Sequence, residues 1–135
     1  MSDRAIEPYG DPISEPFWKA ATRREFVIQK CRRCAAYQFY PRPFCLACFA
    51  DDIEWVPAAG TGTIYSLTTV RRQVFPDFPV PYVNAVVELD EGPRLLTTIV
   101  GSTCAIGDRV RVVWKERVSA PPLPLFEPID RMPSA

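Results

Sequence analysis

Apolar and polar residues alternate along most of the second half of the chain. The alternation is clearest in the segments TIYSLTTV, YVNAVVEL, RLLTTIVG and DRVRVVWKERV, with turn-forming residues at 90–92 and 106–108. A period of two places successive side chains on opposite faces of a strand, so each segment is expected to be a β-strand. In the first of them, Ile64 and Thr68 are expected to share one face, with Leu67 on the other.

The pattern near the start of the chain is helical. The sequence SEPFWKAA is typical of a helix start, with Ser14 as the N-cap, an acidic first turn and a proline where no N–H is needed. The helix is expected to end near residues 24–25. Phe17, Ala20 and Ala21 then share one face, a narrow apolar stripe. The segment FVIQK that follows is rich in strand-forming residues and leads directly into the first cysteine.

Four of the five cysteines fall in one stretch, CRRCAAYQFYPRPFCLAC, at Cys31, Cys34, Cys45 and Cys48. Two residues between paired cysteines let a tight turn direct both sulfurs at one point, and two such turns complete a tetrahedron around Zn²⁺. Four protein ligands leave no open position for water or substrate, so the sequence predicts a structural zinc ion. Iron in a rubredoxin-like redox centre, and cysteines that are disulfide-linked or bind no metal, remain the alternatives.

These patterns together predict the fold class. Counting Ile53–Val56 as a first strand, the four alternating segments give five strands, which fit a small closed or nearly closed barrel, with an OB-fold as the simplest choice. The chain is expected to be mostly β and to consist of an N-terminal helical segment (1–25), a rubredoxin-like four-cysteine zinc ribbon (26–52), a five-stranded OB-fold barrel (53–118) and an extended proline-rich tail (119–135).

Composition narrows the possible functions. The chain has 135 residues, with sixteen basic and sixteen acidic side chains, so its formal net charge of zero gives no overall attraction to nucleic acid or to an anionic membrane. It has no histidine, which removes Ser-His-Asp and Cys-His catalysis and mixed Cys/His zinc fingers. No secretory leader and no membrane-spanning run is recognisable, so we expect a cytoplasmic protein that does not enter a membrane.

A small enzyme acting alone is a minor alternative. Its candidate acid, base or nucleophile would be Asp77, Asp90, Glu91 or Cys104. Carboxylates in turns are usually solvated, and a thiol without a histidine to activate it is more often a small packed residue. No activity is therefore expected of the isolated chain.

A single-stranded nucleic-acid-binding module is the other alternative, because OB-folds and zinc ribbons both serve that role. It needs a basic groove with stacking aromatics, and the candidate is Arg71 and Arg72 beside Phe75 and Phe78 in a proline-rich loop. The same loop can equally pack its own aromatic rings. The zero net charge makes nucleic acid an unfavoured partner.

The order of parts resembles a known family. With FWKAATRREFVIQKCRRC, YPRPFCLAC, EWVPAAGTGTIYSLTTV, PYVNAVVELDEGPRLLTTIVG and PLFEP, the chain is similar from about Phe17 to Pro128 to the zinc-ribbon and OB-fold proteins catalogued as domain of unknown function thirty-five. The resemblance implies a non-catalytic scaffold or acyl-CoA-binding subunit of a thiolase-like or lipid-transfer-protein-like enzyme in acyl-CoA, lipid or steroid metabolism. It also implies that the four ribbon cysteines bind zinc.

Two surfaces follow as expectations. If coenzyme A binds, its phosphates need arginines near the barrel mouth, and Arg71, Arg72 and Arg94 are the candidates.

The ribbon and helix also carry more aromatic surface than so small a module can hide. We expect the side of the second cysteine pair, with Phe44, Leu46 and Phe49, to dock on the partner enzyme or on a second copy of this chain. Packing of these rings onto the barrel is the alternative.

Overall fold

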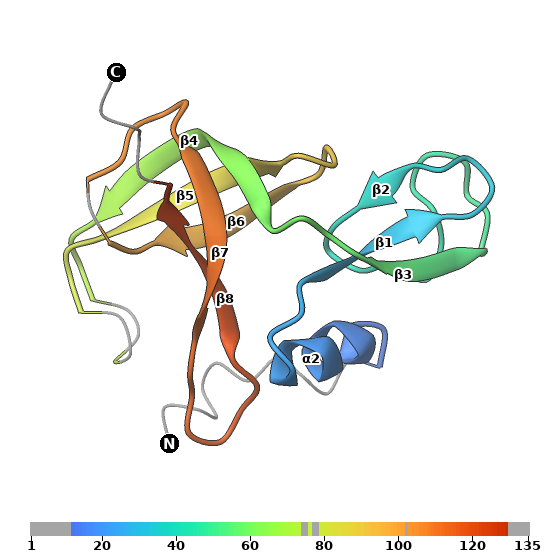
Figure 1. Cartoon of the computed structure of the whole chain (residues 1–135), viewed down its shortest axis with the longest axis horizontal. Coiled ribbons are helices and arrows are strands. Elements are labelled where there is room, and N and C mark those ends of the chain that lie inside the picture. The colour runs from blue at the N-terminus through green and yellow to red at the C-terminus, as the bar shows by residue number, and fades with distance from the viewer. Residues whose placement is uncertain (1–11, 74–75, 77–78, 102, 130–135) are drawn as a thin grey trace.

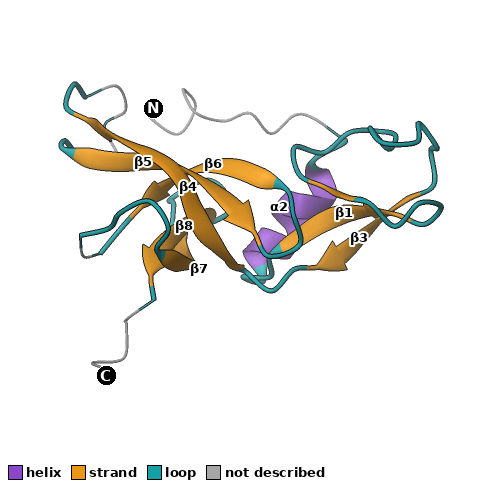
Figure 2. Ribbon diagram, turned by 90° about the horizontal axis from the view of Figure 1, so that it is seen from above, coloured by secondary structure: helices purple, strands orange, loops and turns teal. Residues whose placement is uncertain are grey.

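The computed structural model describes residues 12–73, 76, 79–101 and 103–129. A three-stranded unit and a closed barrel lie side by side, and one helix lies below the junction between them (Figure 1). Seen from above, the helix lies beside β1 at the same junction (Figure 2). The expected fold class, a helix followed by a zinc ribbon and a five-stranded barrel, is confirmed. Phe75, Phe78 and Asp77 lie outside the described residues.

Helix α2 spans Glu15–Thr22 and begins as expected, with a proline in its first turn. Ser14 occupies the N-cap position, but its side chain makes no capping hydrogen bond. Its carbonyl instead accepts a hydrogen bond from the Phe17 N–H (3.0 Å). Phe17, Ala20 and Ala21 are buried, so the expected apolar stripe faces the protein. The helix is too short to cross a membrane, and no longer apolar helix occurs in the described part of the chain.

The first sheet has the order β2-β1-β3, with β1 at Val27–Cys31, β2 at Tyr37–Gln38 and β3 at Ile53–Pro57. Both pairings are antiparallel. The expectation that Ile53–Val56 forms a barrel strand was wrong. The chain leaves the second cysteine pair beside the strand that enters the first, so Ile53 pairs with Cys31 and β3 continues along β1.

The barrel contains β4 (Thr61–Val70), β5 (Tyr82–Leu89), β6 (Arg94–Ile99), β7 (Arg109–Lys115) and β8 (Leu123–Pro128), in the order β4-β5-β6-β8-β7. Five strands were expected, but the fifth was misplaced. The proline-rich end was expected to lie extended over the surface, whereas the structure uses β8 to close the barrel.

Strand β8 tolerates its prolines because of the direction in which they point. It pairs along its length with β7 and meets β6 only where Ile99 pairs with Phe126. The Phe126 carbonyl points toward β6, where it accepts a hydrogen bond from Val100. Pro124 and Pro128 have the same orientation, because they lie two residues away on either side. Their missing N–H groups therefore face β6, where β8 makes few backbone hydrogen bonds. Burial of the Phe126 side chain stabilises the strand in this position.

A β-bulge changes the side-chain pattern of β4. The register against β5 shifts between Ile64 and Ser66, which inserts one residue and reverses the alternation beyond it. Leu67 therefore packs against the core with Ile64, and Thr68 is exposed. The expected grouping of Ile64 with Thr68 was wrong for this reason.

One aromatic cluster joins the helix, the ribbon and the barrel. Phe26, at the entry to β1, lies at its centre and is buried. Its ring centroid lies 6.0 Å from that of Phe126 in the barrel, 6.1 Å from Phe17 in the helix and 6.2 Å from Phe39 in the ribbon. The contacts with Phe126 and Phe17 are edge-to-face and the contact with Phe39 is stacked, and such ring pairs stabilise a junction beyond simple burial of area. The two units therefore share one continuous hydrophobic core.

Candidate metal centre and its surroundings

The two cysteine pairs adopt the same local geometry. In the first, the N–H of Cys31 donates to the carbonyl of Ala36 (2.9 Å); in the second, the N–H of Cys45 donates to Ala50 (2.8 Å). Each turn then places its fifth residue in the left-handed region, with φ of 66° at Ala35 and 65° at Phe49. Glycine is the residue that usually eases such a position, and neither turn has one.

The four sulfurs come together as the spacing predicts. All four Sγ atoms lie within 4.8 Å of one another, and the Cys31–Cys48 and Cys34–Cys45 sulfurs are each 3.6 Å apart. Zinc–sulfur bonds of about 2.3 Å in a tetrahedron require sulfur–sulfur edges of about 3.8 Å. Two of the sulfur–sulfur distances are close to this edge, and the four sulfurs converge closely enough to enclose a Zn²⁺ ion. All four positions of such an ion would be filled by protein, so it would be structural rather than catalytic.

Backbone N–H groups support the inner sulfur of each pair. Cys31 Sγ accepts from the N–H groups of Arg33 and Cys34 at 3.3 and 3.4 Å, and Cys45 Sγ accepts from Ala47 and Cys48 at the same two distances. These bonds favour thiolate, the form that binds metal. This geometry does not separate zinc from iron, since amide donors also tune redox iron centres.

The thiols cannot all ionise easily without a cation. Hydrogen bonds from the Cys48 and Ala47 backbone outweigh burial and lower the pKa of Cys45 to about 6. At Cys34 the Ala36 backbone favours thiolate, but hydrogen bonds to the neighbouring thiols and burial outweigh it and raise the pKa to about 12. A divalent cation removes this conflict, because it compensates the charge of all four thiolates at once.

Two buried glutamines hold the loop that carries the second cysteine pair. Gln29 in β1 accepts hydrogen bonds from the Gln38 side chain (2.8 Å) and the Arg42 N–H (2.9 Å), and donates to the Arg42 carbonyl (3.0 Å). Gln38 in turn donates to the Phe44 carbonyl (3.2 Å) and accepts from the Leu46 N–H (3.1 Å). Sequence reasoning missed this pair. The available signal was a polar residue inside the strand segment FVIQK, immediately before the cysteines.

The cations around the centre have separate roles. Arg32 forms ion pairs with Asp52 (2.9 Å) and Glu54 (3.3 Å). Lys30 lies 5.4 Å from the centroid of the Tyr37 ring. Among the described residues, Arg42 has no carboxylate partner.

The large apolar residues of the helix and the ribbon divide into two groups. Phe17 is buried at the junction, and Phe39 and Trp18 are partly buried against the same core. Phe44, Leu46 and Phe49 are instead exposed, with Phe49 at 73%. The alternative that these three pack onto the barrel core is wrong. Their side chains are therefore available to a partner, as the expected interface requires.

The three candidate arginines for coenzyme A do not converge. Arg71 and Arg72 follow the end of β4 and are exposed, whereas Arg94 begins β6. Arg94 is paired with Glu88 of β5, and Glu88 is paired with Thr63 of β4. Thr63 precedes Arg71 by eight residues, so Arg94 and Arg71 are separated by roughly 25 Å along the strand direction. Arg94 also forms an ion pair with Glu88 (3.5 Å) and lies 3.8 Å from the Tyr65 ring centroid. One anionic ligand site cannot include all three.

The described candidates for catalysis serve structural roles. Asp90 pairs with Arg109 (2.7 Å), and Glu91 accepts a hydrogen bond from the Ala59 N–H (2.8 Å). Burial raises the pKa of the Cys104 thiol, with a smaller contribution from Asp108, so the reactive thiolate is disfavoured. None of these three has the environment of an activated group.

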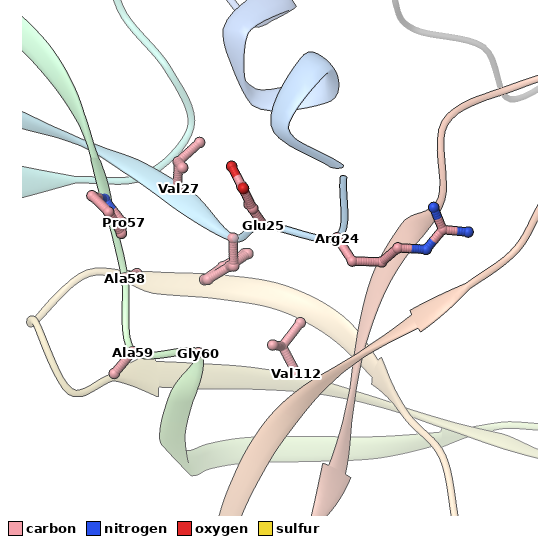
Figure 3. A pocket seen from close by; sticks show the side chains of 9 residues that line it. Arg24, Glu25, Val27, Pro57, Ala58, Ala59, Gly60 and Val112 are labelled. Atoms are coloured by element: carbon pink, nitrogen blue, oxygen red, sulfur yellow. The ribbon is translucent and has the colours of Figure 1, made fainter. Parts of the chain in front are cut away.

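A pocket of about 480 Å³ lies where the chain crosses between the two units. Figure 3 shows its lining, which comes from the α2–β1 turn, the β3–β4 connection and Val112 of β7. Its two titratable lining residues are already engaged, Glu25 with Arg23 and Arg24 with Glu116. The pocket lies at the junction of the two units, and no titratable group in its lining is free to take part in a reaction.

Comparison with known families gives the same two parts. Residues 18–54 match the family model described as the rubredoxin-like zinc ribbon domain of ChsH2, and residues 55–115 match the C-terminal OB-fold domain of ChsH2. The chain is also 33% identical over 106 residues to a DUF35 domain-containing scaffold protein of Methanothermobacter thermautotrophicus, and the alignment covers 73% of this chain and 79% of that protein. The chain belongs to the DUF35 family. Its four-cysteine centre is therefore the zinc centre of a DUF35 ribbon.

Longer relatives contain a similar segment. This DUF35 chain is 41% identical over 116 residues to a protein of Thermomonospora curvata named "Probable enoyl-CoA hydratase alpha subunit". It is 29% identical over 115 residues to the 3-oxo-4,17-pregnadiene-20-carboxyl-CoA hydratase alpha subunit of Mycobacterium tuberculosis. The alignments cover 83% of this chain but only 36% and 37% of the two relatives. The chain thus spans little more than a third of these hydratase subunits.

Solved structures share the arrangement. A chain of the Ltp2-ChsH2(DUF35) aldolase superposes with a TM-score of 0.82 at 38% identity, and the match covers 90% of this chain and 98% of that one. A DUF35 protein of unknown function from Sulfolobus solfataricus superposes with a TM-score of 0.65 at 18% identity, covering 96% and 93%. The second match supports the fold alone.

Proposed function

We propose that this chain is a non-catalytic accessory subunit that binds an enzyme of acyl-CoA, lipid or steroid metabolism. The observation that carries the proposal is its 38% identity to a chain of the Ltp2-ChsH2(DUF35) aldolase, 98% of which the match covers. The site agrees with this role, because its closed four-sulfur centre has no position for substrate and its described catalytic candidates are engaged elsewhere.

The partner in this proposal is a thiolase-like or lipid-transfer-protein-like enzyme. Contact with acyl-CoA is a finer part of the proposal, and Arg71 and Arg72 are its candidates because both are exposed and adjacent at one end of the barrel. Arg94, at the start of β6, lies level with Thr63 of β4 and is too far from Arg71 to share that ligand site. Reversing the charge of Arg71 and Arg72 together is expected to weaken acyl-CoA binding in calorimetry.

The experiment is co-expression of the tagged full chain with a thiolase-like or lipid-transfer-protein-like enzyme of the same organism. We expect a stable complex in size-exclusion chromatography, greater acyl-CoA turnover by the complex than by the enzyme alone, and no turnover by the isolated chain. A chain that stays separate from the enzyme, or that turns over acyl-CoA by itself, contradicts the proposal.

Binding of single-stranded nucleic acid has less support. Arg94 lies 3.8 Å from the centroid of the exposed Tyr65 ring, so a base that stacked on that face of the ring would have to displace the guanidinium. Salt-dependent retention of the protein on a single-stranded DNA column is the measurement that would favour this function over the first.

A further inference from the structure

Exposed apolar side chains concentrate in one region of the molecule. Of the ten large exposed hydrophobic residues in the described part of the chain, three lie elsewhere: Ile13, Ile106 and Val118. The other seven come from the ribbon and from two barrel strands. We call them the ribbon–barrel surface: Tyr37, Tyr40, Phe44, Leu46, Phe49, Tyr65 and Leu96.

Direct contacts make this surface continuous across the two units. The hydroxyl of Tyr40 accepts a hydrogen bond from the Leu96 N–H (2.9 Å), which joins the ribbon to β6. Leu46 of the ribbon and Arg94 of the barrel line the same shallow groove. Arg94 in turn lies against Tyr65 on β4. The exposed residues of the ribbon and of the barrel therefore form one surface rather than two.

Two of the exposed aromatic residues, Tyr40 and Phe49, have an unfavourable backbone conformation. Tyr40 and Phe49 have φ of 62° and 65°, in the left-handed region that disfavours bulky residues. The structure nevertheless leaves Phe49 73% exposed, so burial of the ring gives the isolated chain little in return. At Phe49 the cysteine turn sets this φ, as it does at the equivalent Ala35, and the turn therefore directs the ring outward.

The charge beside these rings indicates the kind of partner. Arg42 lies in the chain between Tyr40 and Phe44, and it has no carboxylate partner among the described residues. Lys30 lies over the ring of Tyr37. Aromatic side chains with adjacent arginine are the residues that contribute most at protein interfaces. The complementary surface would be apolar and edged by carboxylates.

We propose that the ribbon–barrel surface is the docking face for the partner enzyme, which contacts the second cysteine turn and strand β6 at the same time. This inference rests on the proposed function and specifies its interface. It extends the expected site at Phe44, Leu46 and Phe49 to Tyr40, Tyr65 and Leu96, which the sequence did not indicate.

The test measures binding of the partner enzyme, a thiolase-like or lipid-transfer-protein-like protein, to variants of the full zinc-loaded chain. Leu96→Asp places a charge on β6, away from the metal, and Phe49→Asp does the same at the second cysteine turn. Ile106→Asp is the matched control, since Ile106 is 65% exposed and Leu96 is 61% exposed. Each variant is first checked for zinc content and melting temperature.

We expect Leu96→Asp and Phe49→Asp each to weaken binding at least tenfold in calorimetry, and Ile106→Asp to change it less than twofold. Arg42→Glu should also weaken binding, and the loss should shrink as salt is raised. If Phe49→Asp loses zinc, Leu96→Asp decides the question alone.

The other outcomes separate the two proposals. Unchanged affinity of Leu96→Asp in a complex that forms normally would overturn the continuous surface while leaving the accessory function intact. A wild-type chain that does not bind the enzyme would overturn the function itself. A wild-type dimer in light scattering that Leu96→Asp converts to a monomer, with enzyme binding unchanged, would assign the surface to a second copy of this chain.

Discussion

The ribbon and the barrel are held together by different kinds of interaction. The barrel closes through five paired strands around fully buried residues such as Val87, Val110 and Phe126. The ribbon has one short three-stranded sheet, four converging sulfurs and two buried glutamines. Its exposed aromatic residues contribute little to its own core. Hydrophobic burial therefore defines the barrel, whereas the metal and a polar network define the ribbon.

This difference allows the ribbon to present apolar side chains to a partner without unfolding. A module that depended on its aromatic residues for a core could not leave Phe49 and Leu46 exposed. The sulfurs fix the cysteine turns instead, and the turns set the direction of the rings. The barrel supplies a stable base through the aromatic cluster around Phe26.

Loss of zinc should separate the two regions most strongly. Structural zinc contributes on the order of 10 kcal/mol of apparent folding free energy in small modules. A strong chelator, or Cys34→Ser, should therefore abolish protection of ribbon amides in hydrogen exchange while the amides of β5 and β6 stay protected. Loss of protection in both regions together would show that the barrel depends on the metal as well. Elemental analysis showing iron instead of zinc would overturn the metal assignment.

Phe26→Ala should weaken the connection between the regions. The ring is buried among Phe17, Phe39 and Phe126, so its removal leaves a cavity and should lower the free energy of unfolding by about 3–5 kcal/mol. Zinc content should be unchanged, because Phe26 lies outside both cysteine turns. Urea unfolding followed by separate ribbon and barrel probes measures both effects. Coincident, unshifted transitions would contradict a shared core.

Gln38→Leu should damage the ribbon alone. The substitution removes one of the two donors to the Gln29 oxygen and leaves the Phe44 carbonyl and the Leu46 N–H without their side-chain partner, at a cost of about 1–3 kcal/mol. Competition with a colorimetric chelator should show weaker zinc retention, and thermal melting of the barrel should not change. Zinc retention equal to that of the wild type would show that the sulfurs alone determine the loop.

Asp90→Asn should produce a small effect confined to the barrel. Arg109, with Thr61, lowers the pKa of Asp90 from its ordinary 3.8 to about 2. The stabilisation is therefore present above pH 3.8 and is lost as the pH falls toward 2. Because the pair is largely exposed, the variant should lose no more than about 1 kcal/mol at neutral pH. The difference from wild type should disappear in denaturant titrations near pH 2, and a constant difference would contradict the linkage.

Sequence patterns predicted the parts that depend on local spacing. The C-x-x-C pairs determine the sulfur cluster because each turn is set by its own four residues, and strands with strict alternation, such as β5, were predicted correctly. Patterns failed where partners are distant in sequence. Strand β3 has the composition of a barrel strand but pairs with β1, and β8 is rich in proline but is held by burial of Phe126.

The same limit applies to the site. Gln29 and Gln38 act through contacts with a loop up to thirteen residues away, and the local sequence offered no more than a polar residue inside the strand segment FVIQK. The bulge that redirects Leu67 follows from pairing with β5 rather than from a local signal. The ribbon–barrel surface could not be predicted either, because Tyr40 and Leu96 are 56 residues apart and meet only in the fold.

The central claim is that a metal-built ribbon completes a docking surface that the barrel alone does not provide. The most direct test compares how tightly the partner enzyme binds the zinc-loaded chain and the chelator-treated chain. Circular dichroism must show that the barrel remains folded in both. The account predicts that removal of zinc reduces affinity at least tenfold and that added zinc restores it. Equal affinity of the zinc-free chain would show that the ribbon is not part of the interface.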